Sequence, residues 1–201
     1  YIAADCLNLT KVSYPATVKA IGEQAFKNTA LKEMPSLESV ESISNHAFDG
    51  IKTLTSNVII PDSVKAMDAG AFQNIKTTGN VIISSDLGQS TTVGAGLFKG
   101  AEIGGDLEIR CAAVPASMFK NVTLNGSLKL LDGLEEIGSE SFRGLKVTDS
   151  TGLDLPSTLK IVGSQAFHSP ALWPCLPGWK ALEPALSATT NLPGTSPSPA
   201  A

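Results

Sequence analysis

The feature that most constrains this chain is the regular spacing of its phenylalanines. All seven follow one another at intervals of 22, 24, 26, 21, 23 and 25 residues: Phe26, Phe48, Phe72, Phe98, Phe119, Phe142 and Phe167. A period of this length is typical of an array of stacked structural units. The spacing therefore predicts a solenoid of about seven repeats of about 23 residues.

The neighbours of each Phe repeat with it. Five positions before the Phe, every copy has an aliphatic residue: Ile21, Ile43, Met67, Val93, Val114, Ile137 and Val162. Two positions after it, every copy has a turn former: Asn28, Gly50, Asn74, Gly100, Asn121, Gly144 and Ser169. A single unit this short cannot bury its own apolar side, whereas stacked units share one core. We therefore expect each Phe to point inward and to join a spine of Phe side chains.

The other half of each repeat is predicted to be a short strand. Apolar runs, or apolar residues that alternate with charged ones, occur at 58–60, 81–83, 107–109, 128–130 and 153–155; such patterns are typical of strands. Pro61 and Pro156 follow two of these runs, where a missing N–H ends a ladder. About ten residues then remain before the Phe, enough for a short helical or 3₁₀ turn. The predicted class is α/β, with one parallel sheet and short helical turns opposite it.

Three segments resemble one known family. YPATVKAIGEQAF (14–26), IPDSVKAMDAGAF (60–72) and LPSTLKIVGSQAF (155–167) are similar to BspA-like leucine-rich repeats, and Cys6 lies where that family commonly has Cys. The resemblance covers about residues 5–169. It is degenerate in the repeats that end at Phe98 and Phe119, and Met34-Pro35 makes the strand register between Phe26 and Phe48 uncertain.

The resemblance implies a curved solenoid with its parallel sheet on the concave face. It also implies a secreted or surface-exposed protein of the kind found in bacteria and some protozoan parasites, where members are linked to adhesion. These functional implications are analogy, because a fold does not fix a function.

The chain divides into a solenoid at 1–169 and a different segment at 170–201. The second segment holds seven of the twelve Pro and both Trp, and it carries only two charged residues, Lys180 and Glu183. It is predicted to be a C-terminal cap around residues 173–179, or a linker, stalk or foreign sequence. Further repeats are expected to flank this chain in its parent protein. An uncapped first repeat would expose sheet edge and core, which favours end-to-end self-association.

Several functional classes find no support in the residues. A net charge of −4 argues against a nucleic-acid partner, and no apolar stretch approaches the ~20 residues of a membrane span. Cys6, Cys111 and Cys175 have no zinc-binding spacing, and His46 and His168 lie about five repeats apart. We expect Cys111 to be buried, and Cys175 is the candidate for an exposed thiol. No cofactor or metal is predicted, and no enzyme activity.

Two other short motifs have limited weight. Gly94-Ala95-Gly96 lacks the following Lys of a phosphate-binding loop, so it is interpreted as easing a degenerate turn. Glycosylation sequons begin at Asn8, Asn121 and Asn125 and matter only if the source glycosylates Asn.

The candidate partner-binding residues lie on the predicted concave sheet. The middle residue of each strand faces outward. This rule nominates Ser13, Ile59, Ile82, Glu108, Lys129 and Asp154. Ile59 and Ile82 are predicted to form an apolar patch unless a loop covers them. Glu108, Lys129 and Asp154 alternate in sign and are expected to pair across strands.

The sequence thus predicts a binding or adhesion module, extracellular or at the cell surface. Its partner would be a protein or glycan on a host or neighbouring cell. The alternative is a structural spacer of a larger surface protein, with no ligand of its own.

Overall fold

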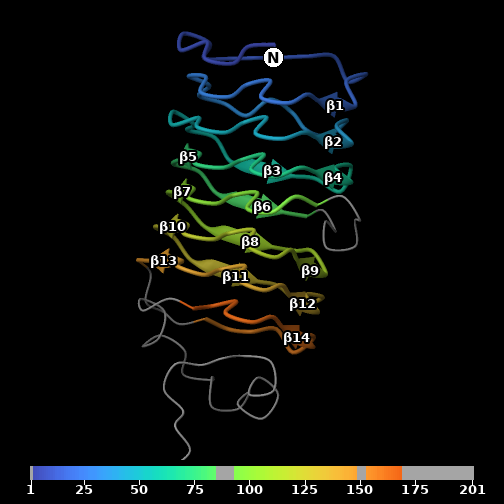
Figure 1. The fold of residues 1–201 in the computed structure, drawn as a ribbon, viewed down its shortest axis with the longest axis vertical. Helices are drawn as coiled ribbons and strands as arrows, with labels where there is room; N and C mark the ends of the chain where they lie inside the picture. Colours follow the sequence, from blue (N-terminus) through green and yellow to red (C-terminus); the bar gives the residue numbers. More distant parts are fainter. Residues whose placement is uncertain (1, 85–92, 149–152, 169–201) are drawn as a thin grey trace, which may run out of the picture.

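The chain winds into a stack of similar turns. The computed structural model describes residues 2–84, 93–148 and 153–168. In Figure 1 the turns succeed one another along a single long axis, starting from the N-terminus. All of the paired strands in these residues run parallel and join equivalent positions of neighbouring turns. The predicted parallel β-solenoid is therefore confirmed.

Three strand ladders run along the stack. The first ends five residues before six of the seven Phe and forms two sheets: β1 (Ala20–Ile21), β2 (Ser42–Ile43) and β4 (Ala66–Met67), and then β9 (Ala113–Val114), β12 (Glu136–Ile137) and β14 (Ile161–Val162). Between the two sheets, before Phe98, only an isolated bridge joins Met67 and Val93. The second follows the Phe: β5 (Lys76–Thr77), β7 (Glu102–Ile103), β10 (Thr123–Leu124) and β13 (Lys146–Val147). The third comprises β3 (Val58–Ile60), β6 (Val81–Ile83), β8 (Leu107–Ile109) and β11 (Leu128–Leu130). Only the third was predicted as a sheet, because two-residue strands leave little periodicity in a sequence.

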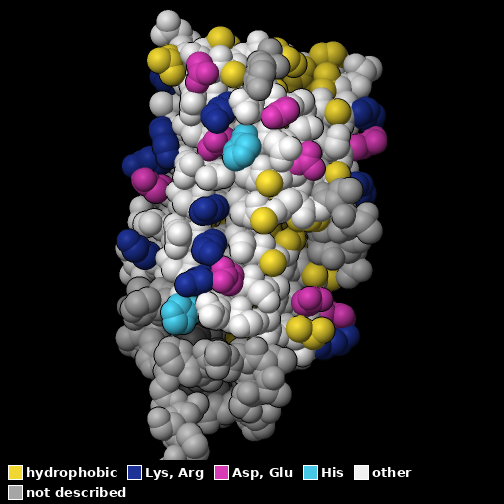
Figure 2. Space-filling view, in the orientation of Figure 1, with side chains coloured by type: hydrophobic (Ala, Val, Ile, Leu, Met, Phe, Trp, Pro, Cys, Tyr) yellow, Lys and Arg dark blue, Asp and Glu magenta, His cyan; other side chains and the backbone are white. Residues whose placement is uncertain are grey.

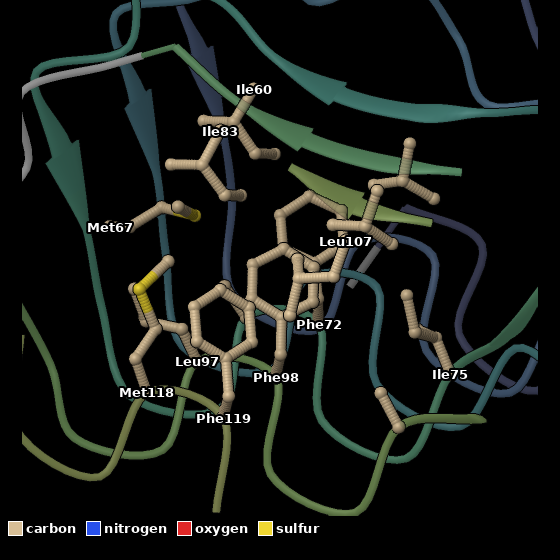
Figure 3. Close-up of a cluster of buried hydrophobic side chains, with 14 of the residues drawn as sticks. Ile60, Met67, Phe72, Ile75, Ile83, Leu97, Phe98, Leu107, Met118 and Phe119 are labelled. Carbon is tan, nitrogen blue, oxygen red and sulfur yellow. The ribbon is translucent and has the colours of Figure 1, made fainter. Parts of the chain in front are cut away.

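The seven Phe side chains form the predicted spine. Consecutive rings have centroids 5.0–5.4 Å apart and planes within 22° of each other, as expected for stacked aromatic rings. Figure 3 shows Phe72, Phe98 and Phe119 stacked in the core. The aliphatic residues five positions before the Phe, such as Ile43 and Met67, are also buried. The spine and these aliphatic residues together make one continuous core.

The turns around the Phe are not helical in the described residues. The residue two positions before the Phe has a left-handed φ of 52–66° in all seven copies: Gln24, His46, Gly70, Gly96, Ser117, Glu140 and Gln165. The residue two positions after it has φ of 53–77° in six: Asn28, Gly50, Asn74, Gly100, Asn121 and Gly144. Two left-handed residues four positions apart, one on each side of the Phe, interrupt a right-handed helix. The α/β class and the helical turns are therefore not confirmed.

The backbone hydrogen bonds of these segments also differ from those of a helix. The N–H of Phe26 donates to the carbonyl of Ala47 in the next turn at 2.8 Å, and that of Asn28 donates to the carbonyl of Asp49 at 2.8 Å. These donors bond across the stack and not four residues back, as they would in a helix. The turn segments therefore form a fourth hydrogen-bonded ladder.

The irregular repeats keep the spine. Leu97 and Met118 replace the usual Ala before the Phe, and both are buried beside Met67 in the core. The uncertain register between Phe26 and Phe48 corresponds to a missing strand: residues 34–36 belong to no strand, and Pro35 is buried there. Because Pro has no N–H, it cannot donate to a ladder.

The first turn covers the Phe26 end of the core. The N–H of Ala3 donates to the carbonyl of Ala25 at 2.9 Å, so Ala3 lies where later turns have their Phe. As a result Phe26 is only 5% exposed. Ile2 and Leu7 on this turn remain 82% and 72% exposed. The end-to-end association expected from the sequence stays a prediction. Residues 170–201, and with them the predicted cap and Cys175, lie outside the described residues.

Candidate functional site

The strand face is the outward side of the β3, β6, β8 and β11 sheet. Its middle residues are in register, so Ile59, Ile82, Glu108 and Lys129 lie side by side on consecutive strands. Ile59 is 44% exposed, Lys129 is exposed, and Ile82 and Glu108 are half-buried. Their flanking strand residues, such as Ile60, point into the core. The outward orientation expected for these four residues therefore agrees with their geometry, while their role in binding stays a prediction.

Two nominated residues lie outside this sheet. Ser13 and Asp154 are both exposed, but neither 12–14 nor 153–155 forms a strand. For Ser13 the neighbouring turn offers Pro35, which has no N–H to pair with it. The structure thus brings four of the six candidates together.

A polar ladder borders the strand face. The side-chain oxygen of Asn57 accepts from the N–H of Asn80, that of Asn80 accepts from Asp106, and that of Asp106 accepts from Ser127, each at 2.9 Å. These bonds link consecutive turns just before each strand and fix the strand register. This ladder was not predicted from the sequence, although its members recur two positions before the outward residues.

The charges on the strand face pair with neighbours that the sequence analysis did not name. The Lys129 Nζ lies 2.6 Å from Asp106 Oδ2, and Arg110 Nε lies 2.6 Å from Glu108 Oε1. The hydrogen bond from Lys129, with a further one from the Ser127 N–H, lowers the pKa of Asp106, and the same pair raises the pKa of Lys129. The expected direct pairing of Glu108, Lys129 and Asp154 is not what the structure shows. One half of this face is apolar, and the other half has its charges satisfied internally.

A second feature lies on the turn face, the surface formed by residues around the Phe. Lys99, Lys120 and Arg143 each directly follow a Phe, and we call these three the basic column. Figure 2 shows Lys and Arg side chains following one another along this surface, and both histidines of the chain are visible there. Glu140 contacts two members: its Oε2 lies 2.6 Å from Lys120 Nζ and its Oε1 lies 2.7 Å from Arg143 Nη1. The Lys120 hydrogen bond is the main cause of a lowered Glu140 pKa. These three residues were not among the candidates predicted from the sequence, although their position directly after the Phe could have revealed them.

The remaining candidate chemistry is sparse. His46 Nδ1 lies 3.3 Å from Asp49 Oδ2, and His168 is exposed on a distant turn. Cys111 is buried, as predicted, and Cys6 is exposed. In the described ranges no three His, Cys, Asp or Glu side chains gather as metal ligands would. Nor does that part of the chain contain a helix long and apolar enough to cross a membrane.

The weak glycine cluster has a structural role. Gly96 has a φ of +66°, and a Cβ on Gly94 would lie 1.9 Å from the backbone nitrogen of Ala69. Gly94 therefore permits close stacking on the preceding turn, which agrees with its interpretation as part of a degenerate repeat. The three sequon residues, Asn8, Asn121 and Asn125, are all exposed.

The family of this chain is shown by one comparison with known proteins, the match to a family model. A search of curated proteins finds no match. Among solved structures, a leucine-rich repeat protein from Bacteroides ovatus is similar at 17% identity and a TM-score of 0.35. The match covers 84% of this chain and 66% of the other, so this chain spans less than two thirds of that protein. The model of the BspA type leucine-rich repeat region matches residues 1–121 and 112–173 in six copies. The chain, with its Phe-centred turns and parallel ladders, therefore belongs to the BspA type leucine-rich repeat family.

Proposed function

We propose that this chain is a non-enzymatic binding module of a secreted or surface-exposed protein. The strand face would contact a protein or glycan partner on a host or neighbouring cell. Family membership supports an interaction role, because repeat solenoids offer extended surfaces to partners. The solenoid segment 1–169 is the part of the chain that this proposal concerns.

One observation carries the proposal. Ile59 is 44% exposed and lies in register with Ile82 on the next strand, so two β-branched side chains are adjacent on an outward surface. Exposed apolar clusters of this kind mark contact surfaces more often than scattered single residues do. Beside them, Glu108 and Lys129 are held by Arg110 and Asp106. A partner would therefore bury the isoleucines without stripping water from unpaired charges.

The test is binding to immobilised, purified extracellular-matrix proteins and glycans. The double variant Ile59→Lys/Ile82→Lys places two charges on the strand face. A matched control, Ser42→Lys/Ala66→Lys, places the same two charges at outward positions of β2 and β4, on a different ladder. Circular dichroism and thermal unfolding establish that all three proteins are folded.

The expected result is saturable binding that the strand-face variant loses and the control variant retains. Equal loss in both variants would move the contact away from the strand face. No binding by the folded wild-type chain would favour the alternative, a structural spacer of a larger surface protein with no ligand of its own.

A further inference from the structure

Oppositely charged residues pair at several places along this solenoid. Five ion pairs join equivalent positions of neighbouring turns: Lys11–Glu33, Lys19–Glu41, Lys27–Asp49, Lys76–Glu102 and Lys160–Glu135. Like charges that lie opposite each other on adjacent strands destabilise a ladder. Pairs of opposite charge are therefore the arrangement that stability favours at such positions.

The basic column differs from these pairs, because it places like charges at equivalent positions. Lys99, Lys120 and Arg143 occupy the same position, directly after the Phe, in three consecutive turns. The Phe centroids of these turns lie 5.4 and 5.3 Å apart, which sets the repeat of the column. In the part of the chain that the structure describes, this is the longest run of like charges at equivalent positions. Earlier in the same column, Lys27 is followed by Asp49, which it contacts at 3.5 Å.

Among the described residues, Glu140 is the only acidic side chain that forms an ion pair with the column. Glu140 bonds to Lys120 and Arg143, so the column and Glu140 together keep a formal charge of +2 (three cations less one carboxylate). Lys99 is exposed and has no ion-pair partner among the described residues. His168, exposed in the next turn at the same position, extends the column on its far side.

The residues beside the column have small side chains. The residue three positions before the Phe is small in these turns, namely Ala95, Ala116 and Ser139. Ala95 and Ala116 are exposed, and Figure 2 shows small apolar side chains next to the basic ones on this face. A linear ligand that runs along the solenoid axis would therefore meet one cation per turn beside small side chains.

We propose that the basic column binds a linear acidic polysaccharide, with sulfate or carboxylate groups along the chain. A repeating anionic polymer offsets the repulsion that the column creates and matches its one-dimensional geometry. A nucleic acid fits less well, because no aromatic side chain lies on this surface among the column and its small neighbours to stack on bases. This site lies on the turn face and is independent of the strand face discussed above.

The experiment measures binding of a sulfated glycosaminoglycan to the chain by surface plasmon resonance at low and high salt. The variant Lys99→Gln/Lys120→Gln/Arg143→Gln removes the column. The control Lys19→Gln/Lys65→Gln/Lys160→Gln removes three cations from another set of equivalent positions, so the net charges of the two variants are equal. We expect the association rate constant of the column variant to be about tenfold lower than that of the wild type, or lower still. The association rate constant of the control variant should equal that of the wild type.

A second variant tests the role of Glu140. In Glu140→Gln the two cations lose their carboxylate, and the left-handed turn is kept, because Gln24 and Gln165 occupy the same position with φ of 52° and 56°. This variant is expected to bind the polysaccharide several-fold more tightly, with a steeper decrease of affinity as salt rises. A variant that only lost stability would not gain affinity.

Three results would overturn the proposal: no binding by folded wild type, equal losses in the two triple variants, or unchanged affinity for a desulfated, carboxyl-reduced form of the polysaccharide. Binding of a DNA duplex as tight as that of the polysaccharide would also overturn it in favour of a nucleic acid. The Ile59→Lys/Ile82→Lys variant adds two positive charges on the other face. If this variant still binds the polysaccharide, the polysaccharide site is separate from the strand face, whether or not the variant binds matrix proteins.

Discussion

The Phe spine and the strand face differ in how far they repeat. From Phe26 onward, each turn places a Phe in the core, with ring spacing that varies by only 0.4 Å, from 5.0 to 5.4 Å. On the strand face, equivalent positions hold Ile59, Ile82, Glu108 and Lys129, four side chains of three different chemical kinds. Inside, each ring has the next ring as its neighbour, so a change affects two contacts at once. Outside, each side chain faces solvent and can change independently. The interior determines the fold, and the exterior is free to determine the partner.

The largest expected effect is on the spine. Phe98→Ala removes a fully buried ring between two others, and we expect a loss of about 3–5 kcal/mol in the free energy of unfolding. Urea denaturation followed by circular dichroism measures it. Phe26→Ala, at the end of the spine with one ring neighbour, should cost less. Equal costs at the two positions would contradict a spine in which each ring depends on both neighbours.

A smaller effect is expected where Asn and Gly alternate two positions after the Phe. A Cβ on Gly144, whose φ is +71°, would lie 2.3 Å from the Asn121 side-chain oxygen. We therefore expect Gly144→Ala to destabilise by about 1–2 kcal/mol or more, since an L-residue is strained there and the Asn must move. The double variant Asn121→Gly/Gly144→Ala removes the contact, so part of the loss should be recovered. If the effects of Asn121→Gly and Gly144→Ala on the free energy of unfolding simply add, the contact between the two residues does not cause the loss.

A pH-dependent effect is expected at the border of the strand face. The pKa of Asp106 is lowered from its ordinary value of 3.8, chiefly by the Lys129 hydrogen bond. A lowered folded-state pKa means that the contribution is present above pH 3.8 and is lost as the pH falls through the folded-state value. Asp106→Asn keeps an acceptor for the Ser127 N–H but loses the ion pair. We expect its Tm to be about 1–2 °C below wild type at pH 7 and to converge with it in acid, because the pair is partly exposed. A Tm difference that stays constant with pH would show that the ion pair is not its cause.

The smallest expected effect is on the strand face itself. Ile59→Lys leaves the core untouched, so its unfolding free energy should change by about 0.5 kcal/mol or less. Thermal unfolding beside Phe98→Ala gives the contrast directly. A loss comparable with that of the spine variant would mean that Ile59 belongs to the core and would remove it from the candidate partner surface.

The sequence predicted the interior well and the surface incompletely. The positions of the Phe and of the aliphatic residues five before it follow from a repeat of 21–26 residues, and these predictions agree with the described structure. The apolar run around Ile59 and the alternation around Glu108 also located their strands. The helical turn was wrong, because propensity around residues such as Gln24 does not reveal a left-handed φ of 52°. The partners of Glu108 and Lys129 were missed, because the side-chain contacts join residues two positions away on the same or the next strand.

The period by itself determined the architecture, since a short unit with one large inward aromatic residue can bury that residue only against a copy of itself. It did not determine which backbone groups bond to each other. The tertiary structure decided that the turn N–H groups donate to the next turn. A carbonyl oxygen of the stacked copy lies 2.8 Å from the backbone nitrogen of Phe26, and another lies 2.8 Å from that of Asn28. It also decided which charges meet. Lys99, Lys120 and Arg143 are more than twenty residues apart in the chain, and only the stacking of turns at about 5 Å makes them one surface.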